Sequence, residues 1–266
     1  MSNIVIAFLL TAVAGLSTGI GSAIAFFAKK TNTRFLAVSL GFSAGVMVYI
    51  SMIELLTGSM ETLSGIYGAK PGTIYALLAF FGGMGLIALI DKLIPENKNP
   101  HAVTSPEHAA EAMKDPQQLM RAGVLTALAI AIHNFPEGMA TFVSALQEPG
   151  IAIPIVVAIA IHNIPEGIAV SVPIYYATGD KKRAFWLSFA SGLSEPLGAI
   201  IGYLILLPFM SDTLNGLLFS AVGGIMVFIS FDELLPSARE YGEHHLSIYG
   251  LVGGMAVMAL SLWLFM

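Results

Sequence analysis

Cysteine is absent from this 266-residue chain, and only 11% of its residues are charged. Without cysteine the chain has neither disulfides nor thiolate metal ligands, so a metal site here must use His, carboxylate, amide or thioether groups. A soluble domain is about a quarter charged because its surface must face water. Since 56% of this chain is apolar, the composition predicts an integral membrane protein.

Nucleotide-binding and nucleic-acid-binding features are also missing. The chain has no GxxxxGK segment followed by Ser or Thr, the loop that cradles nucleotide phosphates. We therefore expect no ATP-driven motor in this chain and no nucleic-acid partner. The lipid bilayer is the expected surrounding of the whole protein.

Eight apolar stretches approach the 20 or so residues that a spanning helix requires. They predict an all-α integral membrane protein, an eight-transmembrane-helix bundle that forms a single polytopic domain over residues 1–266. The expected spans are Ile4–Ala28, Leu36–Leu56, Gly72–Ile94, Leu125–Leu146, Ile151–Tyr176, Ala184–Met210, Leu214–Leu235 and Ile248–Met266.

Basic residues gather on one side of this arrangement. Eleven of the 12 Lys and Arg residues follow spans 1, 3, 5 or 7, and only Lys70 falls in a connection on the other side. Cytoplasmic loops carry the excess of Lys and Arg. The pattern therefore predicts that these loops are cytoplasmic and that both termini are extracytoplasmic. The first span has its basic residues after it, which argues against a cleaved signal peptide.

One sizeable polar segment interrupts the apolar pattern. Residues 95–120, between spans 3 and 4, form a polar cytoplasmic loop that contains His101 and His108. We expect this loop to be poorly ordered. Its histidines either gather metal at the cytoplasmic mouth or belong to an ordinary solvated loop, and the second interpretation is favoured.

Glycines recur at four-residue spacing in four spans, which lets helix backbones approach closely in lipid. This spacing fits either a compact bundle or the face of a homodimer. The pairs are Gly15 and Gly19, Gly41 and Gly45, Gly198 and Gly202, and Gly250 and Gly254.

The most informative feature is a duplicated hexapeptide. HNFPEG occupies residues 133–138 in span 4, and HNIPEG occupies residues 162–167 in span 5. In a helix, a His and a Glu four residues apart share a face, and the Asn next to the His lies partly on it. The proline frees a backbone carbonyl one turn earlier, and that carbonyl must be satisfied within the membrane. Neighbouring antiparallel helices could bring both faces together.

The acids of these spans have no basic partner in sequence. Neither Lys nor Arg occurs between Arg121 and Lys181, or between Arg183 and Arg239, an interval that contains Glu195 in span 6. An ionised side chain at the bilayer centre costs at least about 2.5–3.5 kcal/mol. The buried acids Glu137, Glu166 and Glu195 must therefore be protonated, solvated or bound to a cation.

The expected ligand types rank the cations. Imidazole favours Zn²⁺ and other transition metals over Mg²⁺ and Ca²⁺, which prefer all-oxygen sites. The mixed set predicts a metal site for Zn²⁺, with Fe²⁺ and Mn²⁺ as further substrates, and two bridging carboxylates would allow a binuclear site. The predicted metal ligands are His133, Asn134, Glu137, His162, Asn163, Glu166 and Glu195.

These residues resemble the ZIP family of divalent metal transporters (Zrt/Irt-like proteins), including its bacterial zinc-uptake members. The likeness rests on both HNxPEG motifs and on Ser194-Glu195-Pro196, and it extends over essentially the whole chain. It implies a mid-membrane site built from the seven residues above, with Glu137 and Glu166 bridging two metals. It also implies elevator-like alternating access and Zn²⁺ uptake, with Cd²⁺ among the further substrates, across a bacterial cytoplasmic (inner) membrane.

Some positions weaken parts of this resemblance. Met47 matches a position that supplies a thioether ligand in some members, although a Met on an apolar helix usually packs. Many members have His at the position of Asp232 and a second acid at the position of Ser237. The resemblance therefore does not imply the family's usual exit site near the cytoplasm.

Three other functions compete with transport. An intramembrane metal-dependent hydrolase would need a general base beside its metal ligands, but the chain has no HExxH motif and no obvious nucleophile constellation. A proton or monovalent-cation carrier would also use buried carboxylates, but the paired imidazoles favour a softer dication. A metal-gated scaffold without flux could be told apart only by measuring transport.

Overall fold

The computed structural model describes residues 3–24, 33–93, 116–147, 149–241 and 244–264, and all of its regular elements there are helical. In chain order these are α1 (Asn3–Ile24), α2 (Thr33–Ile50), the π-helical turn η1 (Ser51–Leu56), α3 (Thr57–Tyr67), α4 (Ala69–Leu93), α6 (Pro116–Gln147), α7 (Pro149–Thr178), α8 (Lys181–Gly192), α9 (Ser194–Ile201), the short turns η3 (Gly202–Leu206) and η4 (Leu207–Phe209), α10 (Asp212–Ile229), the π-helical turn η5 (Ser230–Leu234), α11 (Leu235–Tyr241) and α12 (His244–Leu264).

The predicted class, an all-helical membrane bundle, is confirmed. Within the described residues, seven helical segments are long and apolar enough to cross a bilayer, and they match every expected span except the fourth. The fourth span, Leu125–Leu146, lies within the 32-residue helix α6. Eight spans therefore remain a prediction, as do the positions of the termini relative to the membrane.

Several boundaries differ from those expected. Residues 57–71 were predicted to connect two spans, but the second span continues through η1 into α3 and ends at Tyr67. Gly68 then turns the chain with a φ of 88°, a conformation that suits glycine, and α4 begins at Ala69. The reason is tertiary, because α3 packs against α4 and α10 and is stabilised by contacts that local polarity does not reveal.

Helix α6 also begins earlier than predicted. Residues 116–120 were assigned to the polar loop but form its first turn. The rest of that loop, with His101 and His108, lies outside the described residues. The sixth span is interrupted at Leu193, where α8 ends and α9 begins. Because of this break, Glu195 lies in the first turn of α9.

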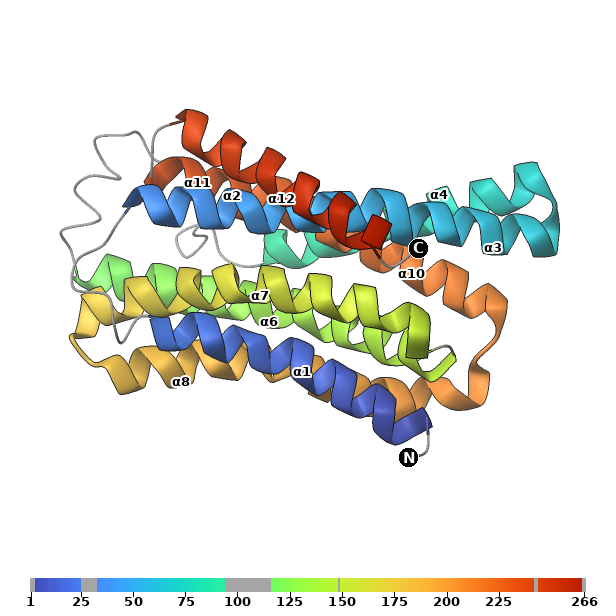
Figure 1. The fold of residues 1–266 in the computed structure, drawn as a ribbon, viewed down its shortest axis with the longest axis horizontal. Coiled ribbons are helices and arrows are strands. Elements are labelled where there is room, and N and C mark those ends of the chain that lie inside the picture. Colours follow the sequence, from blue (N-terminus) through green and yellow to red (C-terminus); the bar gives the residue numbers. More distant parts are fainter. Residues whose placement is uncertain (1–2, 25–32, 94–115, 148, 242–243, 265–266) are drawn as a thin grey trace.

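The helices form two layers (Figure 1). One layer contains α1, α6, α7, α8 and α9, and the other contains α2, α3, α4, α10, α11 and α12. Helix α7 lies at the centre of the bundle. In its apolar 18-residue stretch 78% is buried, whereas in those of α4 and α12 only 22% is buried. Outer helices expose large apolar side chains such as Leu78, Phe81 and Trp263. Such a surface suits lipid contact.

Glycines let the helices within each layer touch backbone to backbone. In the first layer, Gly138 of α6 lies against the backbone of Glu195 in α9, and Gly198 of α9 lies against Phe135. In the second layer, Gly45 of α2 and Gly254 of α12 make equivalent approaches. Each of the four predicted glycine pairs contacts a neighbouring helix of the same chain. Packing inside the bundle therefore accounts for them, and a homodimer remains a prediction.

The contact between α6 and α9 can be tested at Gly138. A Cβ at this position would meet the carbonyl of Glu195, which is backbone and cannot rotate away. We expect Gly138→Ala to cost about 1–3 kcal/mol of stability through overpacking. Thermal unfolding of the purified protein in detergent, without added metal, measures the effect.

The matched control is Gly82→Ala. Gly82 lies in α4, where an added Cβ would meet nothing within 4 Å. This variant should unfold at the wild-type temperature or slightly above it, because alanine favours helix. Equal melting temperatures for the two variants would contradict the proposed packing.

Candidate metal centre

Helices α6 and α7 bring the two hexapeptides to the same depth of the bundle. His133, Asn134 and Glu137 lie on α6, and both helices continue through their motif prolines, Pro136 and Pro165. All six predicted ligands of the two motifs are buried, with exposed fractions of 0–2%. The polar faces of α6 and α7 therefore meet inside the bundle, as the sequence led us to expect.

The two motif copies contact each other reciprocally. Nε2 of His133 lies 3.2 Å from Oε1 of Glu166, close enough for a hydrogen bond. Nε2 of His162 lies 3.3 Å from Oε1 of Glu137, at ion-pair distance but without hydrogen-bond alignment. Each imidazole thus pairs with the carboxylate of the other copy, an arrangement that the antiparallel course of the two helices permits. Sequence spacing alone had related each His to the Glu of its own copy.

Glu195 joins this cluster from α9. It is fully buried in the first turn of that helix, directly after the break at Leu193. Nδ2 of Asn163 donates to Oε1 of Glu195 and also to the carbonyl oxygen of Ala14 in α1, at 3.0 Å for the second contact. Asn163 therefore links three helices. Glu195 also lies within electrostatic reach of Glu137 and Glu166.

Asn134 differs from Asn163 in its contacts. Both polar atoms of its side chain are buried, and neither has a hydrogen-bond partner among the described residues. Oδ1 of Asn163 is likewise buried without a partner. An unsatisfied buried amide costs about 1–3 kcal/mol. Such groups are suited to an additional ligand.

The cluster contains more acids than bases. It contains three glutamates and two histidines, and no salt bridge from Lys or Arg reaches these acids in the part of the chain that is described. With all three carboxylates ionised and both imidazoles protonated, one negative charge would remain uncompensated. A buried net charge is unfavourable in a low-dielectric surrounding. A divalent cation would reverse that imbalance.

The side chains meet in pairs rather than around one point. Across the described ranges, no group of three or more His, Asp or Glu side chains is arranged so that it could hold a metal ion as it stands. The His–Glu contacts occupy nitrogen and oxygen atoms that a metal would need. Binding would therefore require these side chains to exchange one another for the ion.

The remaining sequence predictions fall around this cluster. Met47 is fully buried within a large apolar cluster that includes Ile50, Ile159 and Met226, which gives it a packing environment. Glu233 lies in η5 and is only 4% exposed. It is within electrostatic reach of His133. The carboxylate of Glu233 thus belongs to the surroundings of the centre.

Two polar residues near the cluster were missed by the sequence reasoning. Oγ of Ser43 in α2 lies 3.5 Å from Oε1 of Glu166 and 3.4 Å from the carbonyl oxygen of His162. Thr141 lies one turn after Glu137 on α6 and is buried. Its spacing of four from Glu137 is a signal that could have identified it. Ser43 carries no comparable signal, because only tertiary packing brings α2 to this site.

Comparison with known proteins identifies the family. Residues 92–262 match the ZIP zinc transporter family. The chain belongs to the ZIP family. The resemblance inferred from the two HNxPEG motifs is thereby confirmed.

Several bacterial ZIP proteins are similar to this chain over its full length. The chain is 61% identical to the zinc transporter ZupT of Clostridium perfringens over 278 residues, which cover all of this chain and 98% of that protein. It is 63% identical to the zinc transporter ZupT of Streptococcus mutans, covering 97% of each chain. It is 57% identical to the zinc transporter ZupT of Oceanobacillus iheyensis, covering 99% of each.

The two asparagines of this ZIP centre should respond oppositely to the same substitution. Asn163→Leu leaves Glu195 without its amide donor, so it should lower the stability of the metal-free protein by about 1–3 kcal/mol. Asn134→Leu removes two unsatisfied polar atoms and should leave metal-free stability unchanged or raised. Thermal unfolding in detergent with a chelator compares them.

Repeating the measurement with added Zn²⁺ distinguishes an effect on metal binding from an effect on the stability of the metal-free protein. Zn²⁺ should raise the melting temperature of the wild type, because it binds only the folded state. That rise should shrink in Asn134→Leu if its amide oxygen is a ligand. Equal destabilisation of the two metal-free variants would contradict the different roles assigned to the two amides.

Proposed function

We propose that this ZIP transporter carries Zn²⁺ into the cytoplasm through the centre formed by α6, α7 and α9. The observation that supports it is the fully buried set of three carboxylates and two imidazoles, cross-paired between the two motif copies. A buried, acid-rich cluster with mixed nitrogen and oxygen donors matches Zn²⁺ chemistry. Membership of a family of transporters argues against an enzyme.

In this proposal, the ion replaces the His–Glu contacts with metal–ligand bonds. His133, His162, Glu137, Glu166 and Glu195 supply its charged and imidazole ligands, and the free oxygens of Asn134 and Asn163 complete the set. The two glutamates of the motifs would bridge a binuclear site. Carboxylate and amide donors also accept Fe²⁺, Mn²⁺ and Cd²⁺, so these ions are proposed as secondary substrates.

The His–Glu contacts between the two motif copies also favour release of the ion. When Zn²⁺ leaves, each imidazole regains the carboxylate of the other motif copy, so the acids are not left isolated in the membrane. Without such exchange, three bare carboxylates would each cost several kcal/mol. The pairs therefore favour transient binding over storage.

The proposed orientation places the centre within an eight-span protein of the bacterial inner membrane. Helix α6 supplies the eighth span, and both termini are extracytoplasmic. The start of α1, the end of α12 and the α3–α4 turn lie at one end of the bundle, which would be the outer end (Figure 1). Arg34, Arg121 and Arg239 belong to the opposite, cytoplasmic end.

The two layers suit alternating access by relative movement. The metal-binding layer is joined internally by backbone-to-backbone glycine contacts, such as Gly21 with Ile164 and Gly192 with Gly15. Hydrogen bonds from Ser22 to Ser188 (2.7 Å) and from Ser188 to the carbonyl of Gly167 (2.9 Å) join three of its helices. Across the layers, the centre meets α2 through the longer Ser43 contacts. We propose that the first layer moves as a unit past the second, carrying the ion.

Flux through liposomes tests the function directly. Protein reconstituted in vesicles loaded with a zinc-sensitive dye should admit Zn²⁺, and Glu137→Ala should abolish that influx because it removes a ligand and leaves His162 unpaired. Ca²⁺ and Mg²⁺ should not be transported, because neither prefers imidazole. The readout is the initial rate at matched protein content.

Asp212→Asn is the matched control, because it removes a carboxylate that lies outside the centre. Asp212 is exposed in the first turn of α10, away from the centre, so this variant should transport Zn²⁺ at the wild-type rate. Correctly folded wild-type protein that moves no divalent metal under any gradient would refute the transport proposal. The centre would then require a sensing role.

A further inference from the structure

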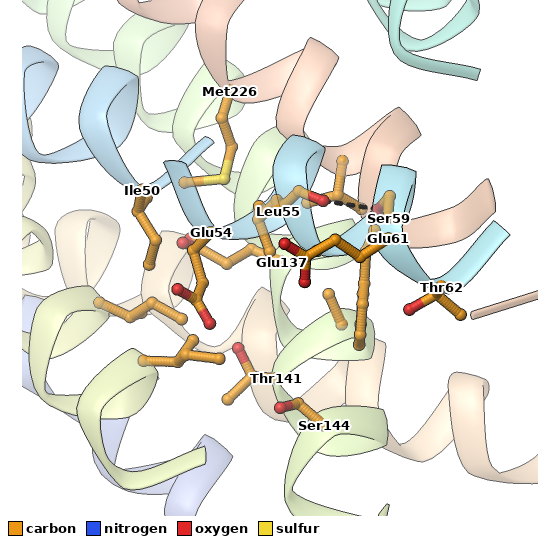
Figure 2. Close-up of a pocket in the computed structure, with 16 residues that line it drawn as sticks. Ile50, Glu54, Leu55, Ser59, Glu61, Thr62, Glu137, Thr141, Ser144 and Met226 are labelled. Atoms are coloured by element: carbon orange, nitrogen blue, oxygen red, sulfur yellow. Dashed lines mark hydrogen bonds between the residues drawn. The ribbon is translucent and has the colours of Figure 1, made fainter. Parts of the chain in front are cut away.

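A cavity of about 390 Å³ adjoins the centre on the side of Glu137. Its walls come from the end of α2, from η1 and α3, from the second half of α6, from the first half of α7, and from α10. Glu54 and Glu61 line it from η1 and α3, and Thr141 and Ser144 line it from α6 (Figure 2). Under the proposed orientation, this is the extracytoplasmic side.

The polar lining of the cavity consists of oxygen donors. Its charged residues are Glu54, Glu61 and Glu137, and no Lys, Arg or His is found among the described residues that line it. Glu54 is half-buried, Glu61 is exposed, and their carboxylates repel each other. Two acids that face the same cavity, with no basic side chain among its described lining residues, are suited to a dication.

Buried groups beyond the two acids also point to an ion. Thr141 is only 1% exposed, and its hydroxyl has no hydrogen-bond partner in the described chain, yet it lines the cavity. Both carboxylate oxygens of Glu137 lack an aligned hydrogen bond as well. Figure 2 shows Glu54 and Thr141 on facing walls of the cavity. These unsatisfied oxygens line the same cavity as Glu54 and Glu61, and those of Glu137 belong to the metal centre as well.

The local backbone presents Glu54 to this space. It lies in the π-helical turn η1, between the regular helices α2 and α3. Single π-helical turns inside α-helices are frequent at functional sites, because the extra residue redirects side chains. Glu61 follows seven residues later in α3, on nearly the same helix face.

We propose that this cavity is an outer cation site, in which Glu54, assisted by Glu61 and the Thr141 hydroxyl, holds a divalent cation before the ion reaches Glu137. The inference rests on the proposed function, because it places the site on the route of the transported metal. The site contains only oxygen donors, which hard cations such as Ca²⁺ and Mg²⁺ accept. It therefore captures dications without selecting among them, and the imidazoles of the inner centre select.

The size of the cavity fits a hydrated ion. A dication with six waters, each occupying about 30 Å³ in the liquid, fits within it. The ion thus keeps most of its water at Glu54 and loses it at the fully buried centre. A consequence follows for ions that are not transported. Ca²⁺ should occupy the outer site and inhibit Zn²⁺ influx without crossing.

Competition between ions tests this site in liposomes. Ca²⁺ outside the vesicles should inhibit Zn²⁺ influx through the wild type competitively. Glu54→Gln keeps the shape of the side chain but removes its charge, so the Ca²⁺ concentration for half-inhibition should rise at least about tenfold. The KM for Zn²⁺ should rise as well. Glu61→Gln, at an exposed position, should act in the same direction to a smaller extent, and Asp212→Asn should not change Ca²⁺ inhibition.

Calorimetric titration of the purified protein with Ca²⁺ separates this proposal from the proposed function. Ca²⁺ binding that is lost in Glu54→Gln supports the outer site even if Zn²⁺ flux fails for other reasons. Zn²⁺ flux whose Ca²⁺ inhibition is unchanged in both Glu54→Gln and Glu61→Gln overturns it, because Ca²⁺ would then act at the inner centre. Absence of both Ca²⁺ inhibition and Ca²⁺ binding in the wild type overturns it equally.

Discussion

The structure depends on one electrostatic constraint, which is that three glutamates are buried among apolar helices and, in the part of the chain that is described, meet no salt bridge from Lys or Arg. Charge in the hydrocarbon region is costly, and the cost is met here by cross-pairing each imidazole with the glutamate of the other motif copy. Glu195 is held instead by the amide of Asn163. The cluster therefore contains more acids than imidazoles. This excess of acids is the reason for proposing a divalent cation as its ligand.

Close helix packing holds these groups at one depth. Glycines at the crossing points allow α9 to lie directly on α6, and α1 on α7, so that residues from three chain segments converge. A similar glycine-based contact joins α2 to α12 in the other layer. Between the layers, the centre meets α2 through the longer Ser43 contacts, and a large apolar cluster draws buried residues from both layers.

The donors along the proposed route change from oxygen alone to oxygen with nitrogen. The outer cavity offers carboxylates and a hydroxyl, whereas the buried centre adds two imidazoles. Hard and soft dications bind oxygen comparably, but imidazole favours transition metals. Capture and selection can therefore occur at different depths. Glu137 touches both, since it lines the cavity and pairs with His162.

Much of this centre could be predicted from sequence because intramembrane charge is so costly. An apolar helix containing His, Asn and Glu without Lys or Arg indicates a cation site by composition alone, and the duplication of HNxPEG identifies two helices that share it. The all-helical membrane class likewise follows from too few charges to cover a water-facing surface. Family membership, too, was already visible in these motifs.

Other features were decided only by tertiary structure. Spacing related each His to the Glu in its own helix, whereas antiparallel packing paired it with the other copy, because side chains respond to the nearest opposite charge in space. The helical continuation of span 2 to Tyr67, the approach of Ser43 and the burial of Glu233 likewise depend on contacts between helices distant in sequence. The sequence determined which buried acids lacked Lys or Arg in their own spans, and the packing of α2, α6, α7 and α9 decided which polar side chains lie against them.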